Sequence, residues 1–403
     1  MTTTLHDVAR AAGVSTKTVS NVINDYPYVR PLTRAKVQAA IAELGYRPNL
    51  SARGLRSGRT GVIGLSVPKL RENYFAELAD AVIQAAQERG LGVVVEQTNE
   101  ARETEIQSLT GGRLRFIDGM LFSPVSLGQD DVALLDVDFP LVLLGERIFG
   151  GPTDHVTMHN SSSAEAAVEH LLGIGRRRIA VVGEVDERPD VASSANLRLQ
   201  GYRQALERAG IPFEPLLVRR VEGWTRQSGA AATRALLADR VDFDAVFALN
   251  DTLGLGVLRA LGEAGVHIPD DVAVIGFDNI DESQYSLPSM STVDPGRMEI
   301  ARLAVDLLIE RINEKGERQP PRTVRPDFRI VGRESTGFPD KGDAAPETNR
   351  LRPRNPAGRS APPRRGGTGT RARRLHRGSR PRAGTTLPPS RRPRAPRGRS
   401  RSS

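Results

Sequence analysis

The chain of 403 residues is long enough for two or three domains, and its 38% hydrophobic content allows a sizeable core. It has no cysteine, which excludes disulfides, thiol nucleophiles and cysteine-bound zinc. Its net charge of +9 is unevenly distributed along the chain, since residues 340–403 hold 19 basic and three acidic residues. Residues 1–60 hold nine basic and three acidic residues, and residues 61–339 carry an acidic excess. This distribution is expected when one end of an acidic protein meets a polyanion.

Two short helices joined by a tight turn are predicted in TLHDVARAAGVSTKTVSNVIN, which occupies residues 4–24. Leu5 and Val8 share one face of the first helix. Gly13 ends that helix and supplies the turn, because it lacks a Cβ. The hydroxyl of Ser15 is a good N-cap for the second helix.

The second helix is predicted to expose a row of polar side chains. Val19 and Val22 face inward, which leaves side chains on the opposite face that can donate to base edges. The outward residues are Thr16, Lys17, Ser20 and Asn21. This arrangement is typical of a helix-turn-helix with a recognition helix. An ordinary surface helical hairpin is the alternative that this stretch alone leaves open.

A third helix is predicted over residues 31–44, ending at Gly45, and YRPNLSARGLRSGRT follows it. The run from Thr4 to Thr60 resembles the DNA-binding headpiece of the lactose/galactose-repressor (LacI/GalR) family. The matching pieces are TLHDVARAAGVS, TVSNVIN, LGYRPN and PNLSARGL. Two departures are Asn21, where an arginine is common, and Arg30, where a capping serine is usual.

The resemblance implies a homodimer that binds a pseudopalindromic operator in double-stranded DNA. It places DNA contacts at Thr4, Ser15, Thr16, Lys17, Thr18, Ser20, Asn21, Asn24, Asn49, Ala52, Arg53, Leu55 and Arg56. In the family, the leucine equivalent to Leu55 wedges into the minor groove, as apolar side chains that kink a duplex do. A flexible linker with an incidental leucine is the alternative.

From Gly61, apolar runs alternate with helical stretches, which predicts an α/β domain with parallel sheets and right-handed crossovers. Strands are expected at residues 61–67, 91–97, 118–123, 139–145, 154–159, 177–183, 215–221, 243–249, 271–277 and within 325–336. Helices are expected at residues 73–89, 103–111, 163–172, 196–209, 227–238, 252–264 and 297–313.

This order of elements resembles the type I periplasmic-binding-protein-like fold of the family, which implies two lobes with a ligand between them. One lobe is expected over residues 61–160 plus 292–320, and the other over 161–291 plus the last strand. The predicted domains are an all-α headpiece (1–47), a hinge (48–60), an effector-binding and dimerisation domain (61–339) and a disordered basic tail (340–403).

Effector candidates lie where predicted strands run into loops, because such sheets bind ligands beyond the carboxyl ends of their strands. They are Tyr74, Phe75, Arg198, Trp224, Asn250, Asp251 and Asp278. Arg198, in ANLRLQGY, matches the family's ligand-binding arginine, and a guanidinium offers a planar fork to vicinal hydroxyls. The aromatic residues can stack on a sugar ring or a base, although core roles stay open for them.

The sequence contains no evident catalytic constellation or cofactor motif, so neither an enzyme nor a cofactor is expected. No metal is expected either, because His155 and His159 lack an evident third ligand. With no signal-peptide core and no spanning run, a cytoplasmic protein without a membrane partner is expected.

The expected function is therefore a ligand-responsive transcriptional repressor of a carbohydrate-utilisation operon, released by a sugar-derived inducer. A purine corepressor is the minor alternative. A solute receptor, an enzyme and an architectural DNA-binding protein dominated by the tail are the other hypotheses. The Arg/Pro-rich tail has three readings: a nonspecific nucleic-acid tail, a partner segment or a translation artefact.

Overall fold

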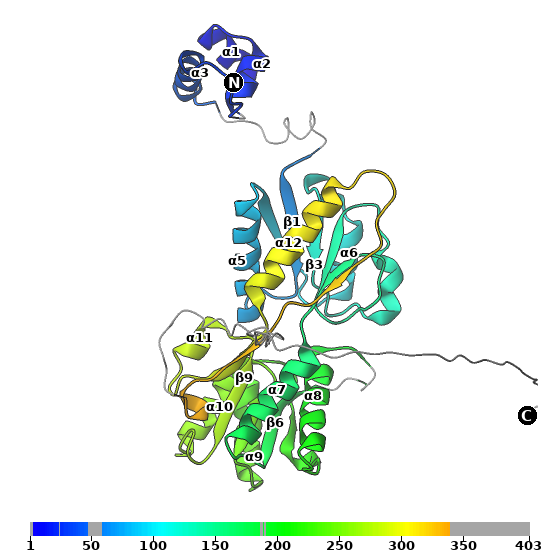
Figure 1. The fold of residues 1–403 in the computed structure, drawn as a ribbon, viewed down its shortest axis with the longest axis vertical. Helices are drawn as coiled ribbons and strands as arrows, with labels where there is room; N and C mark the ends of the chain where they lie inside the picture. Colours follow the sequence, from blue (N-terminus) through cyan, green and yellow to red (C-terminus); the bar gives the residue numbers. More distant parts are fainter. Residues whose placement is uncertain (1–2, 24, 47–58, 186–187, 189–190, 339–403) are drawn as a thin grey trace, which may run out of the picture. The chain divides into compact units, whose positions relative to one another are not determined.

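The computed structural model describes residues 3–23, 25–46, 59–185, 188 and 191–338. Three helices form the headpiece: α1 (Leu5–Ala12), α2 (Thr16–Ile23) and α3 (Pro31–Glu43) (Figure 1). The predicted helix-turn-helix and third helix are thereby confirmed. Asn24, residues 48–58 of the predicted hinge and the predicted basic tail lie outside the described residues. The proposed domain boundaries stay predictions for the same reason.

Helix caps and one small hydrophobic core stabilise the headpiece. The Thr4 side chain accepts from the Asp7 amide at 3.3 Å, and the Asp7 carboxylate accepts from the Thr4 amide at 3.0 Å. Gly13 ends α1 with φ 65°, a conformation that other residues resist. The core is built on Val8, Ala9, Val19, Val22, Val37 and Ala40. Arg30 precedes α3 without a side-chain cap, as the departure from the family pattern predicts.

Lobe 1 is a six-stranded parallel sheet in the order β11-β5-β4-β3-β1-β2. Its strands are β1 (Val62–Val67), β2 (Gly92–Gln97), β3 (Met120–Phe122), β4 (Leu141–Leu144), β5 (Asp154–Val156) and β11 (Thr323–Val324). Its helices are α5 (Asn73–Glu88), α6 (Arg102–Thr110) and α12 (Arg297–Asn313), with 3₁₀ turns η1 (Gly112–Phe116) and η2 (Gln129–Leu135). Helices α5 and α12 pack side by side on this sheet (Figure 1).

Lobe 2 is a second six-stranded sheet in the order β12-β10-β9-β8-β6-β7, parallel except for the β10–β12 pair. Its strands are β6 (Ile179–Glu184), β7 (Val218–Arg220), β8 (Ala245–Ala248), β9 (Ala273–Phe277), β10 (Ser291–Asp294) and β12 (Arg329–Val331). Its helices are α7 (Asn160–Gly173), α8 (Ser194–Arg208), α9 (Arg226–Ala238), α10 (Asp251–Glu263) and α11 (Asp281–Gln284), with η3 (Pro215–Leu217) and η4 (Glu334–Thr336).

The fold class is confirmed, and one boundary of the predicted lobes is wrong. The strand at residues 291–294 pairs with β9 in lobe 2, whereas residues 292 onward were expected in lobe 1. Residues 323–324 return to lobe 1 as β11, beside β5. The chain therefore passes between the lobes after β5, after β10 and after β11. Neither short strand carries the apolar run by which the other strands were recognised.

The central strands are buried on both faces, which explains their continuous apolar runs. All residues of β4, β8 and β9 are buried. Helices cover both faces of such sheets, so neither face needs polar residues. Polar and charged side chains therefore gather where the strands end. In the part of the chain that the structure describes, no helix is both long and apolar enough to cross a membrane.

Candidate functional site

The candidate DNA-binding surface is the outward face of α2. Ser15 caps this helix, because its Oγ accepts from the Thr18 amide at 3.1 Å. Lys17 is exposed, and Thr16, Ser20 and Asn21 are half-buried at the surface. Of the predicted contacts, Thr4 and Ser15 both cap helices, so their hydroxyls at least position α1 and α2. Base contacts by this face stay a prediction, as do those by residues 24 and 49–56.

A cavity of about 260 Å³ opens at the carboxyl ends of strands from both lobes. Six of the seven predicted effector residues line it: Tyr74, Phe75, Arg198, Trp224, Asn250 and Asp278. They come from α5, α8, the segment before α9, and the loops after β8 and β9. Their role toward an effector stays a prediction, but the structure does bring them together.

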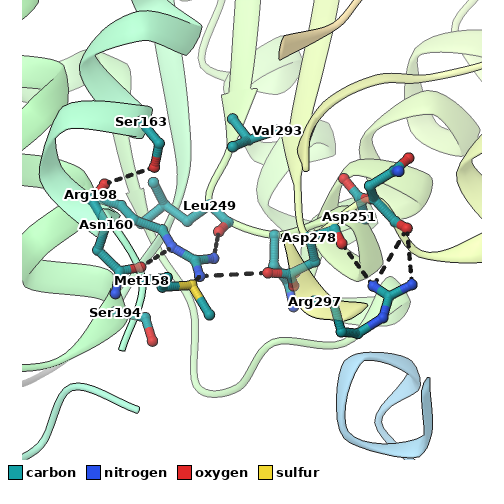
Figure 2. A network of polar contacts seen from close by, with 12 residues as sticks. Met158, Asn160, Ser163, Ser194, Arg198, Leu249, Asp251, Asp278, Val293 and Arg297 are labelled. Atoms are coloured by element: carbon teal, nitrogen blue, oxygen red, sulfur yellow. Dashed lines mark hydrogen bonds and ion pairs between the residues drawn. The ribbon is translucent and has the colours of Figure 1, made fainter. Parts of the chain in front are cut away.

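Arg198 is the best-anchored of these residues, and Figure 2 shows it at the centre of a polar network. Only 2% of it is exposed. Its Nε donates to Asn160 Oδ1 at 2.9 Å, and its Nη1 donates to the Leu249 carbonyl at 2.5 Å. Its Nη2 lies 3.4 Å from Asp278 Oδ1, and its Cζ lies 3.5 Å from the centre of the Phe277 ring. This packing fixes the orientation of the guanidinium.

Asp278 has both a raised side-chain pKa and an uncommon backbone conformation. Burial raises its pKa to about 6, although Arg198 and Arg297 act in the opposite direction. Its φ of 112° is rarely adopted by residues other than glycine. The carboxylate therefore stands at the cavity wall in a conformation that its neighbours must enforce.

Asp251, the seventh predicted effector residue, is not among the residues that line the cavity, and its effector role stays a prediction. Asp251 is fully buried and accepts from Thr292 Oγ1 at 2.6 Å and from Ser283 Oγ at 2.8 Å. The Ile280 amide also donates to it, at 3.0 Å. Burial raises its pKa to about 7. It ties α10 to α11 and β10.

The aromatic and amide residues at the cavity are also held locally. Tyr74 and Phe75 form an edge-to-face pair with ring centres 5.3 Å apart, and burial raises the pKa of Tyr74. Trp224 donates from Nε1 to the Gly183 carbonyl at 2.9 Å and lies near Arg198. Asn250 Oδ1 caps α10 by accepting from the Leu253 amide at 2.8 Å.

Several cavity residues were missed from the sequence. They are Glu72, Glu100, Ser123, Glu146, Arg147, Met158 and Ser194. Glu146 accepts from Ser194 Oγ and, at 3.4 Å, from Asn160 Nδ2, so a polar chain runs from the end of β4 to Arg198. The strand-end rule identifies Glu146 and Arg147, because they lie in the loop that begins at Gly145 after β4.

Among the described residues, no group of three or more histidine or acidic side chains is arranged to hold a metal ion. The cavity groups are instead suited to hydrogen bonding and ring stacking.

Comparison with known proteins identifies the family. Residues 4–49 match the model for bacterial regulatory proteins of the lacI family, and residues 168–336 match a periplasmic binding protein-like domain. The ribose operon repressor of Escherichia coli K12 is 33% identical, over 77% of this chain and 93% of the repressor. This chain belongs to the LacI family.

Two solved structures resemble this LacI-family chain over most of its length. A protein of Sanguibacter keddieii assigned to LacI-family transcriptional regulators is 49% identical, with a TM-score of 0.64, over 70% of this chain and 100% of that one. The lac repressor dimer bound to operator and the anti-inducer ONPF is 27% identical, with a TM-score of 0.70. That match covers 83% of this chain and 99% of the repressor chain, so it includes the headpiece region.

Proposed function

We propose that this LacI-family chain is a transcriptional repressor of a carbohydrate-utilisation operon and is released from DNA by a sugar. The ribose operon repressor and the operator-bound lac repressor support this function. The observation that carries the proposal is the buried Arg198–Asp278 pair, which lines a cavity between the two lobes. In the chain, these lobes follow a helix-turn-helix headpiece.

The proposed DNA complex is a homodimer on a pseudopalindromic operator. Each α2 enters a major groove with Lys17 and Asn21 facing the base edges, and the paired hinges place Leu55 in the minor groove. The operator-bound dimer of the lac repressor supports this arrangement. An effector that changes lobe closure would then change the spacing of the two headpieces.

The charge of the cavity narrows the proposed effector to an uncharged polyhydroxyl compound. Four carboxylates line it (Glu72, Glu100, Glu146 and Asp278), against two guanidinium groups (Arg147 and Arg198). Carboxylates accept from sugar hydroxyls, and an arginine donates to them in a fixed fork. Lys69 offsets part of the charge of Glu72 and Glu100, with which it forms ion pairs. The repulsion that a phosphate or carboxylate on the ligand would meet therefore comes chiefly from Glu146 and Asp278. Tyr74, Phe75 and Trp224 offer rings that stack on a pyranose or furanose.

The protein is proposed to bind its effector without converting it to a product. This binding takes place in the cytoplasm, where the operator is. The relatives named above are regulators, which supports a non-enzymatic role. Incubating the protein with each sugar that releases it from DNA tests this directly. Conversion of that sugar at a rate proportional to protein concentration would contradict it.

The test of the function begins with selection of bound duplexes from a random pool. A panel of matched sugars is then screened for release of the selected duplex: D-ribose with ribose 5-phosphate, D-glucose with glucose 6-phosphate, and D-galactose with D-galacturonate. We expect enrichment of a pseudopalindrome and release only by uncharged members. Release only by the charged members, or tighter binding with hypoxanthine, would overturn the proposed effector class.

A further inference from the structure

Arg297 connects the two lobes at the wall of the cavity. It is the first residue of α12, which packs in lobe 1, and its guanidinium reaches the loop after β9 in lobe 2 (Figure 2). Its Nη1 donates to the Asp278 carbonyl at 2.9 Å. Both Nη atoms lie 3.4 Å from the Asn279 carbonyl. One side chain of lobe 1 therefore holds the backbone that presents the Asp278 carboxylate.

The loop that Arg297 holds needs such support. Asp278 and Asn279 have φ values of 112° and 50°, both in the region that favours glycine. Consecutive residues in this region persist only where surrounding contacts enforce them. Within lobe 2, Arg333 donates to Asn279 Oδ1 at 2.8 Å. The Asp278 carbonyl itself is held from lobe 1, by Arg297.

Glu77 completes the connection from α5. Its carboxylate forms an ion pair with Arg297, and its Oε1 accepts from the Asp281 amide at 3.0 Å. The Glu77 and Arg297 side chains are 24% and 16% exposed, so solvent screens this pair less than it screens a surface pair. Helix α5 also carries Tyr74 and Phe75 into the cavity. Helix α5 thus contributes residues both to the cavity lining and to the Glu77–Arg297 pair.

A second contact between the lobes lies further out. Arg226 Nη2 lies 3.1 Å from Glu282 Oε1 and 3.4 Å from Asn73 Oδ1, and Asn73 also donates to Glu282. The side chains of Arg226 and Glu282 are 52% and 42% exposed. Exposed pairs of this kind contribute little. Arg226 and Glu282 both belong to lobe 2, so only Asn73 reaches across from lobe 1 here. Glu77 and Arg297 of lobe 1, by contrast, both bind the backbone of the loop after β9 in lobe 2.

We propose that Glu77 and Arg297 are positioning residues that couple the effector cavity to lobe 1. They clamp the Asp278–Asp281 loop to α5 and α12, so a ligand that moves the Asp278 carboxylate also moves two lobe-1 helices. This inference rests on the proposed function for its consequence at the operator. The clamp itself consists only of contacts within the protein and is testable without any effector.

The absence of cysteine allows a direct measurement of lobe closure. Glu103→Cys on α6 and Glu207→Cys on α8 are exposed positions in lobes 1 and 2, suited to paired spin labels. Distances between the labels are measured by electron–electron resonance in the full chain, alone and with Glu77→Gln or Arg297→Lys. Glutamine keeps the acceptor for the Asp281 amide but loses the charge, and lysine keeps the charge but loses the fork.

Glu263→Gln is the matched control, because Glu263 also pairs with arginines (Arg234 at 2.7 Å and Arg259 at 2.6 Å) but only within lobe 2. We expect both clamp variants to broaden the distribution or add a longer distance, while the control reproduces the parent protein. Melting temperatures identify any variant whose fold is lost. If Arg297→Lys does not fold, the milder Glu77→Gln decides the question.

Operator affinity provides the second measurement. In the clamp variants the Kd for the selected duplex should change by about fivefold or more, with Glu263→Gln unchanged. Distance distributions that coincide with the parent protein would overturn the clamp. Changed distances with unchanged operator affinity would overturn the coupling. Failure of the parent protein to bind any duplex would instead refute the proposed repressor function, and the distances would still decide the clamp.

Discussion

Replacing Arg198 by methionine tests the centre of the proposed effector site. Methionine keeps a long unbranched side chain but removes the charge and all five donors. The variant loses the bonds to Asn160 and Leu249 and leaves Asp278 without its nearest buried cation. Removing one partner of a buried ion pair costs about 3–5 kcal/mol. Since domains of this kind are stable by about 5–15 kcal/mol, the variant should fold with a much smaller margin.

The loss of stability in Arg198→Met should depend on pH, and the direction of this dependence follows from the pKa of Asp278. Burial holds that pKa at about 6, and Arg198 lowers it. Removing Arg198 raises the pKa further, so the variant is penalised most above about pH 6, where Asp278 is ionised in the parent protein. Below about pH 6 the Asp278 carboxyl is protonated in the folded parent and in the folded variant alike, so the electrostatic part of the loss disappears; the unfolded-state pKa is common to both proteins and cancels.

Urea unfolding at about pH 8 and about pH 5, followed by circular dichroism, measures both effects. The control is Arg203→Met on the same helix, where an exposed arginine lies 4.5 Å from the Phe213 ring and should cost about 1 kcal/mol or less. Equal losses for the two variants, or a loss for Arg198→Met that does not change with pH, would refute the reasoning. The folded variant should also bind operator without responding to the releasing sugar.

Three other predictions concern DNA. Lys17→Ala and Asn21→Ala should each change the preferred bases in the half-site, and an unchanged preference in a binding-site selection would refute their placement in the groove. Leu55→Ala should weaken operator binding much more than binding to random duplex, since a wedge acts where the site is kinked; equal losses would exclude that role. Deleting residues 340–403 should preserve operator-specific binding measured by titration, whereas a protein dominated by its basic tail would lose nearly all of it.

Local patterns account for most of the elements that were predicted correctly. The helix over Arg297–Asn313 was predicted to the residue, and the runs around β1, β4, β8 and β9 were found because buried parallel strands are continuously apolar. The strands β10 and β11 were missed, since STVD and TV are too short and too polar to give such a signal. Their pairing depends on neighbours far away in the chain.

The same limit applies to the cavity. A strand-end rule selects the neighbourhood of Asn250 and Asp251 but does not say which side chain faces the cavity. Asn250 has an extended backbone before α10, whereas Asp251 starts the helix and turns into the protein, toward Thr292 and Ser283. Adjacent residues at a strand end thus have opposite surroundings, and only the packed structure distinguishes them.

By itself, the sequence determined the headpiece and the alternating α/β body, because helix caps, turn glycines and apolar periodicity act over a few residues. Its family was indicated by the resemblance of its headpiece motifs. Tertiary structure decided which distant side chains meet. Arg198 and Asp278 are 80 positions apart, and Glu77 and Arg297 come from two helices of lobe 1 that are separated in the chain by most of lobe 2. Such contacts are set by sheet order and helix packing, which no local spacing records. The reading of DNA was therefore evident from the sequence, whereas its proposed coupling to the cavity required the fold.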